Sequence, residues 1–196
     1  MWNVERIHRR LAEIQQRDPE HKIFGARRHR LGPRLTAREV TAFERKIGVE
    51  LPESFRAFLM EVGNGGAGPS YGLYDVEKAF RLDAMESREG PLNFYTTPFP
   101  HTADWNPPLE TQPENYGDGH WITGSMVRAE FGCGAFHRLA LNGEVWFDDR
   151  CADGGIVRER DFSEWYMTWL DQPHRSGSGV IAEAHAQPRG EREVEA

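Results

Sequence analysis

The sequence predicts an α+β fold with N-terminal helices, a mostly antiparallel β-sheet and a closing C-terminal helix. Three observations lead to this prediction. Apolar residues recur at helical spacing through the first half of the chain, β-type runs separated by glycine turns occupy residues 121–148, and helical spacing returns at 161–171. Strands joined by such short turns pair in antiparallel fashion.

The first predicted helix covers residues 2–17. Its apolar residues fall three or four positions apart, on one helical face: Val4, Ile7, Leu11 and Ile14. A basic linker follows, with Arg-Arg-His-Arg at 27–30. Such a run can contact phosphate, although it is more often a solvated loop. We expect residues 1–34 to form this amphipathic helix and basic linker ahead of the main domain.

Two further helices are predicted between residues 35 and 66. Thr36 and Glu39 have the spacing of a capping box, in which each side chain satisfies a free backbone amide at a helix start. Gly48 suits the end of that helix, and Pro52 suits the first turn of the next. The two apolar faces consist of Val40, Phe43 and Ile47, and of Phe55, Phe58, Leu59 and Val62. Taken alone, the pattern is that of a helical hairpin ended by Gly63-Asn-Gly-Gly66.

The middle of the chain is less regular. Residues 70–74 are expected to form a short strand, and Asp75 to cap a helix whose apolar residues are Val76, Ala79, Phe80 and Met85. Residues 90–120 hold six prolines and several aromatic residues. Proline lacks a backbone donor and is excluded from central strands, while aromatic content argues against disorder. This stretch is therefore predicted to be an ordered loop or a lid.

The predicted strands are residues 121–130, 135–141 and 145–148, with turns at 132–134 and 142–143. Asn-Gly between two apolar runs favours a type I′ hairpin turn, which needs positive φ at both central residues. The closing helix at 161–171 places Phe162, Trp165, Trp169 and Leu170 on one face. Residues 172–196 lack core-forming residues, so we expect a disordered tail.

Composition indicates a soluble, cytoplasmic protein. The chain has 196 residues, a mean hydropathy of −0.68 and 28% charged residues. The chain contains no apolar run of about 18 residues, which is the length needed to cross a membrane. Its first residues also lack the apolar core of a signal peptide. Two cysteines do not make a disulfide framework, and reduced thiols fit the cytosol.

The charge is distributed unevenly along the chain. Residues 1–34 hold nine basic and four acidic residues, whereas residues 35–172 hold twelve basic and twenty-three acidic residues. An acidic body repels nucleic acid and attracts basic partners. The simpler interpretation is that acidity provides solubility. Either way, we expect no nucleic-acid or membrane partner.

The residues that could carry chemistry form no convincing site. His120, Cys133, His137 and Cys151 lack the tight pairs of a zinc site. Cys133 or Ser125 with His137 would give a nucleophile and a base, but we recognise no G-x-S-x-G elbow and no third, orienting group.

A cluster of acidic residues, Asp148, Asp149 and Asp153, lacks the spacing of a calcium loop. It is either a solvated turn or an acidic patch for a basic partner. We therefore predict no catalytic residues, no metal and no cofactor.

The order of these motifs resembles the SMI1/KNR4 (SUKH) superfamily. The resemblance rests on a capping Thr, then E-x-x-x-G-V-x-L-P at 44–52, F-x-x-F-L at 55–59, N-G-G at 64–66, G-x-V-W-x-D at 143–148 and W-Y-x-x-W-L-D at 165–171. It covers about residues 35–171, which we take as the domain. It implies an α+β fold that binds protein and does not catalyse. Many bacterial members are immunity proteins that neutralise a partner toxin.

The resemblance leads us to predict an immunity protein with a toxin partner, and the acidic body favours a basic toxin such as a nuclease. The alternatives are a regulatory or scaffold module for a cytosolic partner, and a small metal-dependent or thiol enzyme. Aromatic residues dominate binding hot spots, and a proline-rich loop holds them at low entropic cost. The same aromatic residues can instead cover the sheet as core. The predicted partner-binding residues are Asn64, Phe99, Trp105, Tyr116, Asp148, Asp149 and Asp153.

Overall fold

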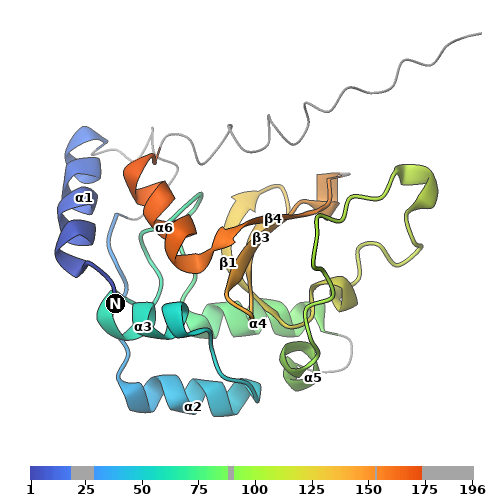
Figure 1. Cartoon of the computed structure of the whole chain (residues 1–196), viewed down its shortest axis with the longest axis horizontal. Coiled ribbons are helices and arrows are strands. Elements are labelled where there is room, and N and C mark those ends of the chain that lie inside the picture. The colour runs from blue at the N-terminus through green and yellow to red at the C-terminus, as the bar shows by residue number, and fades with distance from the viewer. Residues whose placement is uncertain (19–28, 88–90, 153, 174–196) are drawn as a thin grey trace, which may run out of the picture.

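A computed structural model describes residues 1–18, 29–87, 91–152 and 154–173 of the chain (Figure 1). It confirms the α+β class, with a four-stranded antiparallel sheet in the order β1-β2-β3-β4. No helix in these ranges is long and apolar enough to cross a membrane. The helices are α1 (Val4–Arg17), α2 (Ala37–Ile47), α3 (Glu53–Glu61), α4 (Val76–Glu86), α5 (Pro91–Thr96) and α6 (Phe162–Asp171). The strands are β1 (Ser125–Gly132), β2 (Ala135–Ala140), β3 (Glu144–Asp148) and β4 (Ile156–Asp161), and short 3₁₀ turns are η1 (Leu109–Thr111), η2 (Gly119–Ile122) and η3 (Arg150–Ala152).

The predicted helix caps are confirmed. Thr36 and Glu39 form the complete capping box of α2, which ends at Gly48 with a left-handed φ of 77°. The side chain of Asp75 accepts a hydrogen bond from the Lys78 amide at the start of α4. Pro52 lies one position earlier than predicted, as the residue before α3 instead of inside its first turn. These local signals therefore fix where the helices begin and end.

Both predicted hairpin turns are present, and the type of the second differs from expectation. Cys133 and Gly134 join β1 to β2 with φ values of 51° and 84°, so both central residues have the positive φ of a type I′ turn. At the second turn only Gly143 is left-handed, with φ of 103°, and its amide donates to the Ala140 carbonyl. The Asn142-Gly143 prediction of type I′ is wrong, because this loop has three residues and ends in a left-handed glycine.

Other predictions in the sheet region need correction. Residues 70–74 form no strand; only Leu73 makes isolated bridges, to Gly66 and to Ala129. Trp121 belongs to η2, and β1 begins at Ser125. Strand β4 was not predicted, because its Arg158-Glu-Arg160 stretch interrupts apolar alternation. Met85 is not part of the α4 core face, since it is 83% exposed.

The N-terminal helix packs on the body of the protein. It buries Ile7, Leu11 and Ile14, as its spacing predicted. The Trp2 ring meets the rings of Phe58 and Tyr166 edge-on, at centroid distances of 5.1 and 5.9 Å. The start of the chain is thereby joined to α3 and α6, which lie beside α1 in Figure 1. The predicted disordered tail lies almost entirely outside the described residues.

A buried ion pair joins helix α4 to the sheet. Asp83 on α4 pairs with Arg138 on β2, and their side chains are 1% and 3% exposed. The same carboxylate accepts hydrogen bonds from the Tyr95 hydroxyl at 2.8 Å and from the Val127 amide at 3.2 Å. Burial raises the pKa of Asp83, and the charge of Arg138 opposes that rise. One side chain thus joins α4, α5, β1 and β2.

We expect Asp83→Asn to lower the free energy of unfolding by about 3 kcal/mol, because it leaves the Arg138 charge buried without a counter-ion. Urea denaturation measures the loss. Glu77→Gln is the matched control: Glu77 lies on the same helix, and its ion pair with Lys46 is exposed. That change should cost less than about 1 kcal/mol. Equal losses in the two variants would contradict the importance of the buried pair.

Candidate partner-binding surface

The residues 97–121, here called the aromatic loop, are held on the sheet by the backbone. A Cβ on Gly124 would lie 2.4 Å from the Phe99 amide nitrogen and 2.5 Å from the Thr97 carbonyl oxygen, so glycine allows the loop to cross there. Trp105 exchanges two backbone hydrogen bonds with Ile156, of 2.9 and 2.8 Å. The aromatic loop is therefore ordered, as its composition predicted, and it covers the open edge of β4.

Aromatic rings form a continuous stack along this loop. Trp105 stacks on Trp121 at a centroid distance of 4.4 Å and lies 5.0 Å from Tyr116. The His101 ring lies 5.0 Å from the Trp105 ring. Phe99 closes the stack against the buried core residue Trp146, at 5.1 Å. One end of the stack is thus core, while the Trp105–Trp121 end is half-exposed.

The turn after β3 is hydrogen-bonded to the aromatic loop. The Arg150 guanidinium donates to both carboxylate oxygens of Asp148, at 2.7 and 2.9 Å. It also donates to the carbonyl oxygens of Tyr116 and Asp118, at 2.9 and 3.0 Å. The Tyr116 hydroxyl donates to the Gly154 carbonyl. Arg150 therefore connects this turn to the loop, and Asp148 is already neutralised by it.

The structure brings most of the predicted binding residues together. Phe99, Trp105 and Tyr116 share the aromatic stack, and Asp148 adjoins it through Arg150. Phe99 and Trp105 are half-buried, whereas Tyr116 and Asp148 are buried, at 8% and 6% exposure. Tyr116 and Asp148 therefore lie under the surface and hold it in place, and they do not offer side chains that a partner could contact.

The remaining predicted binding residues lie in different situations. Asp149 is half-buried in the turn after β3, where its backbone is hydrogen-bonded to Gly154 and Gly155, and Asp153 lies outside the described residues. Asn64 lies elsewhere, where its side chain accepts a hydrogen bond from the Val76 amide. The predicted partner-binding residues are therefore divided between two places on the molecule.

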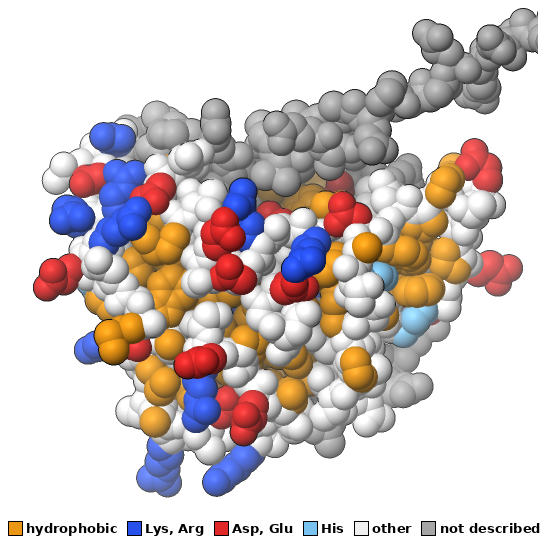
Figure 2. All heavy atoms as spheres, in the orientation of Figure 1, with side chains coloured by type: hydrophobic (Ala, Val, Ile, Leu, Met, Phe, Trp, Pro, Cys, Tyr) orange, Lys and Arg blue, Asp and Glu red, His pale blue; other side chains and the backbone are white. Residues whose placement is uncertain are grey.

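The exposed part of the aromatic loop is apolar and acidic. Leu109 is 70% exposed, and Glu110 and Glu114 beside it are exposed. Residues 97–121 contain four acidic residues and no Lys or Arg. Figure 2 shows hydrophobic and histidine side chains gathered at the end of the molecule that this loop forms, with acidic side chains at the rim. Lys and Arg side chains gather instead around α1 and α2 (Figure 2).

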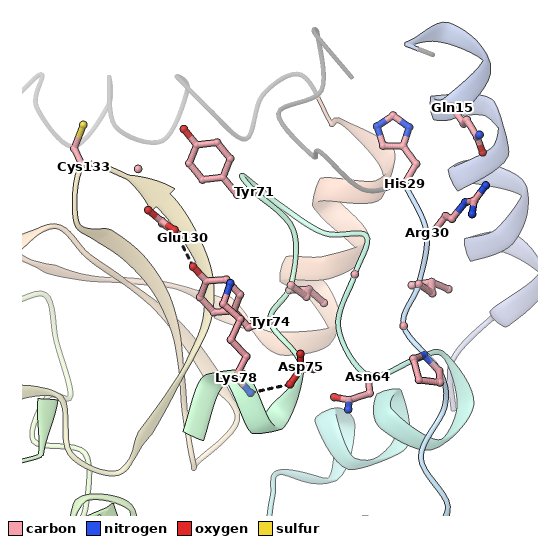
Figure 3. A pocket seen from close by; sticks show the side chains of 16 residues that line it. Gln15, His29, Arg30, Asn64, Tyr71, Tyr74, Asp75, Lys78, Glu130 and Cys133 are labelled. Atoms are coloured by element: carbon pink, nitrogen blue, oxygen red, sulfur yellow. Dashed lines mark hydrogen bonds between the residues drawn. The ribbon is translucent and has the colours of Figure 1, made fainter. Parts of the chain in front are cut away.

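A second surface is an open groove of about 1250 Å³ between the β1 edge of the sheet and α1 (Figure 3). The Lys78 ammonium lies 3.8 Å from the Tyr74 ring centre, and the Tyr74 hydroxyl donates to Glu130. The groove is lined by the positive side chains of Arg30 and Lys78 and by the negative side chains of Asp75 and Glu130, so its charges are mixed (Figure 3). Asn64 lines this groove, whereas Phe99, Trp105 and Tyr116 do not. Because the groove carries charges of both signs, it favours neither an acidic nor a basic partner.

The catalytic pairs considered from the sequence are not formed. The ring nitrogens of His137 contact Glu159, at 2.8 Å, and Ser70, at 3.3 Å, while Cys133 is exposed at the β1–β2 turn. Ser125 is buried and donates to the Ile122 carbonyl. Within the ranges described, no three His, Cys, Asp or Glu side chains are grouped so that they could hold a metal ion.

Sequence reasoning missed three features of these surfaces. His101 lies within the proline-rich residues 90–120, yet nothing in that stretch distinguishes a histidine that joins the stack. Arg150 was overlooked because its role depends on carbonyls more than thirty positions away. Residues 68–72 read Gly-Pro-Ser-Tyr-Gly, so the G-x-S-x-G pattern that we did not recognise is present around Ser70.

Comparison with known proteins identifies one family. The family model described as SMI1 / KNR4 family (SUKH-1) matches residues 34–168. The match covers more than half of the chain and runs from just before the α2 cap into α6. No match was found among curated proteins or among solved structures.

We expect His101 to make the stability of the folded protein sensitive to pH. Burial lowers the pKa of His101, and the charge of Arg150 lowers it further, whereas the hydrogen bond from Nε2 to the Trp121 carbonyl opposes this. The folded protein therefore keeps His101 neutral at a pH where the unfolded chain takes up a proton. Stability should fall as the pH drops below about 6.5, by less than about 1.4 kcal/mol per pH unit.

Urea denaturation at pH 7.5 and pH 5.5 measures this loss. His101→Gln keeps a donor for the Trp121 carbonyl but cannot take up a proton, so the variant should lose less stability on acidification than the wild type. His120→Gln, at an exposed neighbouring histidine, is the control and should behave as the wild type does. An identical pH dependence in the wild type and His101→Gln would contradict the assignment.

Proposed function

Because the chain belongs to the SMI1/KNR4 (SUKH-1) family, we propose that it is an immunity protein, which binds a toxin domain in the cytoplasm and blocks its activity. Binding alone accounts for this role, and no chemical step on the toxin is needed. The observation that carries the proposal is the aromatic loop. It presents stacked, half-exposed tryptophans beside an exposed leucine and acidic side chains.

The physical properties of this loop suit tight binding. Tryptophan and tyrosine supply much of the binding energy in protein interfaces. The loop is already fixed by Gly124, Ile156 and Arg150, so little conformational entropy is lost when a partner docks. Its pre-ordering therefore supports a binding surface.

The charge of the loop suits a basic partner. Glu110 and Glu114 are exposed, and residues 97–121 carry no positive side chain to oppose them. Exposed charges at the rim of an interface mainly increase the rate of association with a partner of opposite sign. A basic toxin such as a nuclease is the partner that this charge favours. Asp148 adds nothing to this attraction, since Arg150 neutralises it.

The proposal is tested by capture followed by a toxicity assay. The tagged protein is cross-linked to its partner in cells of its source, and the partner is identified by mass spectrometry. The partner domain is then expressed alone in a bacterial host, with and without this protein. Growth arrest that co-expression relieves would support immunity. A stoichiometric partner that is harmless alone would contradict it and indicate a regulatory or scaffold module.

We expect Glu110→Lys with Glu114→Lys to weaken the complex about 10- to 100-fold, mainly through slower association, and to reduce rescue of growth. Surface plasmon resonance at two salt concentrations measures the effect, which should shrink at high salt because exposed charges are screened. Glu5→Lys with Glu50→Lys is the control: both residues are exposed, and the net charge changes equally. Equal weakening by both pairs would place the interface elsewhere.

A further inference from the structure

Three side chains on the α6 face of the sheet form a hydrogen-bonded chain. The His137 Nδ1 lies 2.8 Å from a Glu159 carboxylate oxygen, and the His137 Nε2 lies 3.3 Å from the Ser70 hydroxyl. A carboxylate only accepts hydrogen bonds, so Nδ1 carries the proton and the Nε2 lone pair faces Ser70. This is the order of a nucleophile, a base and a group that orients the base.

The backbone conformation of Ser70 also points to a functional site. Ser70 has φ of 55°, and Cys133 is the only other non-glycine residue with positive φ in the described ranges. Such a conformation costs about 1–3 kcal/mol in a non-glycine residue and is concentrated at functional sites. Ser70 is held there by a turn in which the Gly72 amide donates to the Pro69 carbonyl.

The glycines of Gly68-Pro-Ser-Tyr-Gly72 are required by close contacts. A Cβ on Gly68 would lie 2.5 Å from the Leu73 side chain, and a Cβ on Gly72 would lie 2.6 Å from the Gly66 carbonyl oxygen. The turn has the G-x-S-x-G sequence pattern and a strained serine, as in the nucleophile elbow of hydrolases. It differs from that elbow because no helix follows directly; the arrangement of Ser70, His137 and Glu159 carries the argument.

The Ser70 end of this hydrogen-bonded chain is half-exposed, and its His137 end is buried beside aromatic rings. Ser70 is half-exposed and immediately precedes Tyr71, which lines the open groove of Figure 3. The rings of Phe147 and Trp165 lie 5.1 and 5.3 Å from the His137 ring. The Ser70 amide donates no hydrogen bond to the described part of the chain, so it can donate to a carbonyl oxygen. A small, uncharged acyl group fits these surroundings.

We propose that Ser70 is a nucleophile that His137 activates and Glu159 positions, and that the site hydrolyses small carboxylic esters. The Ser70 oxygen attacks the ester carbonyl while its proton passes to His137 Nε2. The tetrahedral intermediate then breaks its bond to the alcohol, which leaves with that proton. Water, deprotonated by the same nitrogen, attacks the acyl-serine. The bond between the acyl carbon and the Ser70 oxygen then breaks, the proton passes from His137 Nε2 back to that oxygen, and the acid is released. This activity lies outside the aromatic loop and does not rest on the proposed binding function.

A fluorophosphonate probe, which labels activated serines, tests the proposal on the full chain. We expect one covalent adduct by intact mass, placed on Ser70 by peptide mapping, and slow turnover of p-nitrophenyl acetate. Ser70→Gly removes the nucleophile and suits a φ of 55°, so the variant should fold and take no label. His137→Gln should slow labelling by at least about 100-fold.

Glu159 is a positioning residue, and its test is rescue by a conservative change. Glu159→Gln should lower the labelling rate, because the carboxylate that accepts from His137 Nδ1 and orients the ring is lost. Glu159→Asp keeps a carboxylate and should restore part of that rate. Circular dichroism and urea denaturation verify that each variant is folded. Cys133→Ser with Cys151→Ser removes thiols that also react with the ester, and this variant should keep the adduct on Ser70.

Two results would overturn the proposal. One is the absence of an adduct on Ser70 in the folded wild-type protein. The other is equal labelling of the wild type and Ser70→Gly, which would place the reactive group elsewhere and leave Ser70, His137 and Glu159 as a structural hydrogen-bond chain.

Discussion

The arrangement of this protein depends on one buried carboxylate. Asp83 holds α4 and α5 against the sheet by pairing with Arg138 and accepting from Tyr95 and Val127. A buried charge is tolerated only when its partners are placed correctly, so this network fixes how the helices meet β1 and β2. The aromatic loop begins directly after α5 and crosses the sheet at Gly124. Its position therefore follows from the position that Asp83 gives to α5.

The sheet separates two surfaces with different chemistry. The aromatic loop and Trp146 lie on the α4–α5 side, whereas His137 and Trp165 lie on the α6 side. Because alternate residues of a strand point to opposite faces, neighbouring residues on β2 serve different surfaces. Irregular segments cover both edges of the sheet: Leu73 bridges to β1 and Trp105 to β4. The covered edges leave the two faces and the loops as the places where partners or ligands can bind.

The candidate surface was only partly predictable. Phe99, Trp105 and Tyr116 could be selected because aromatic residues in a proline-rich segment indicate an ordered loop. Their exposure could not be predicted, and Tyr116 is buried although it belongs to the same segment as Trp105. Asp148 seemed to be a surface charge, but Arg150 pairs with it and buries it. Whether a charge attracts a partner depends on its neighbours in space.

The sequence by itself determined α1, α2, α3, α4 and α6 and their caps, because these depend on residues three or four positions apart, whereas α5 lies in the stretch predicted to be a loop. The order of the motifs along the chain indicated the family. Thr36 with Glu39, and the left-handed Gly48, needed no tertiary information. Only the tertiary structure decided which distant residues meet. It brought Ser70 to His137 and Glu159, Arg150 to Tyr116, and charged β4 to the edge of the sheet. The physical reason is that these contacts join segments whose approach is set by the packing of the whole core, which local spacing does not encode.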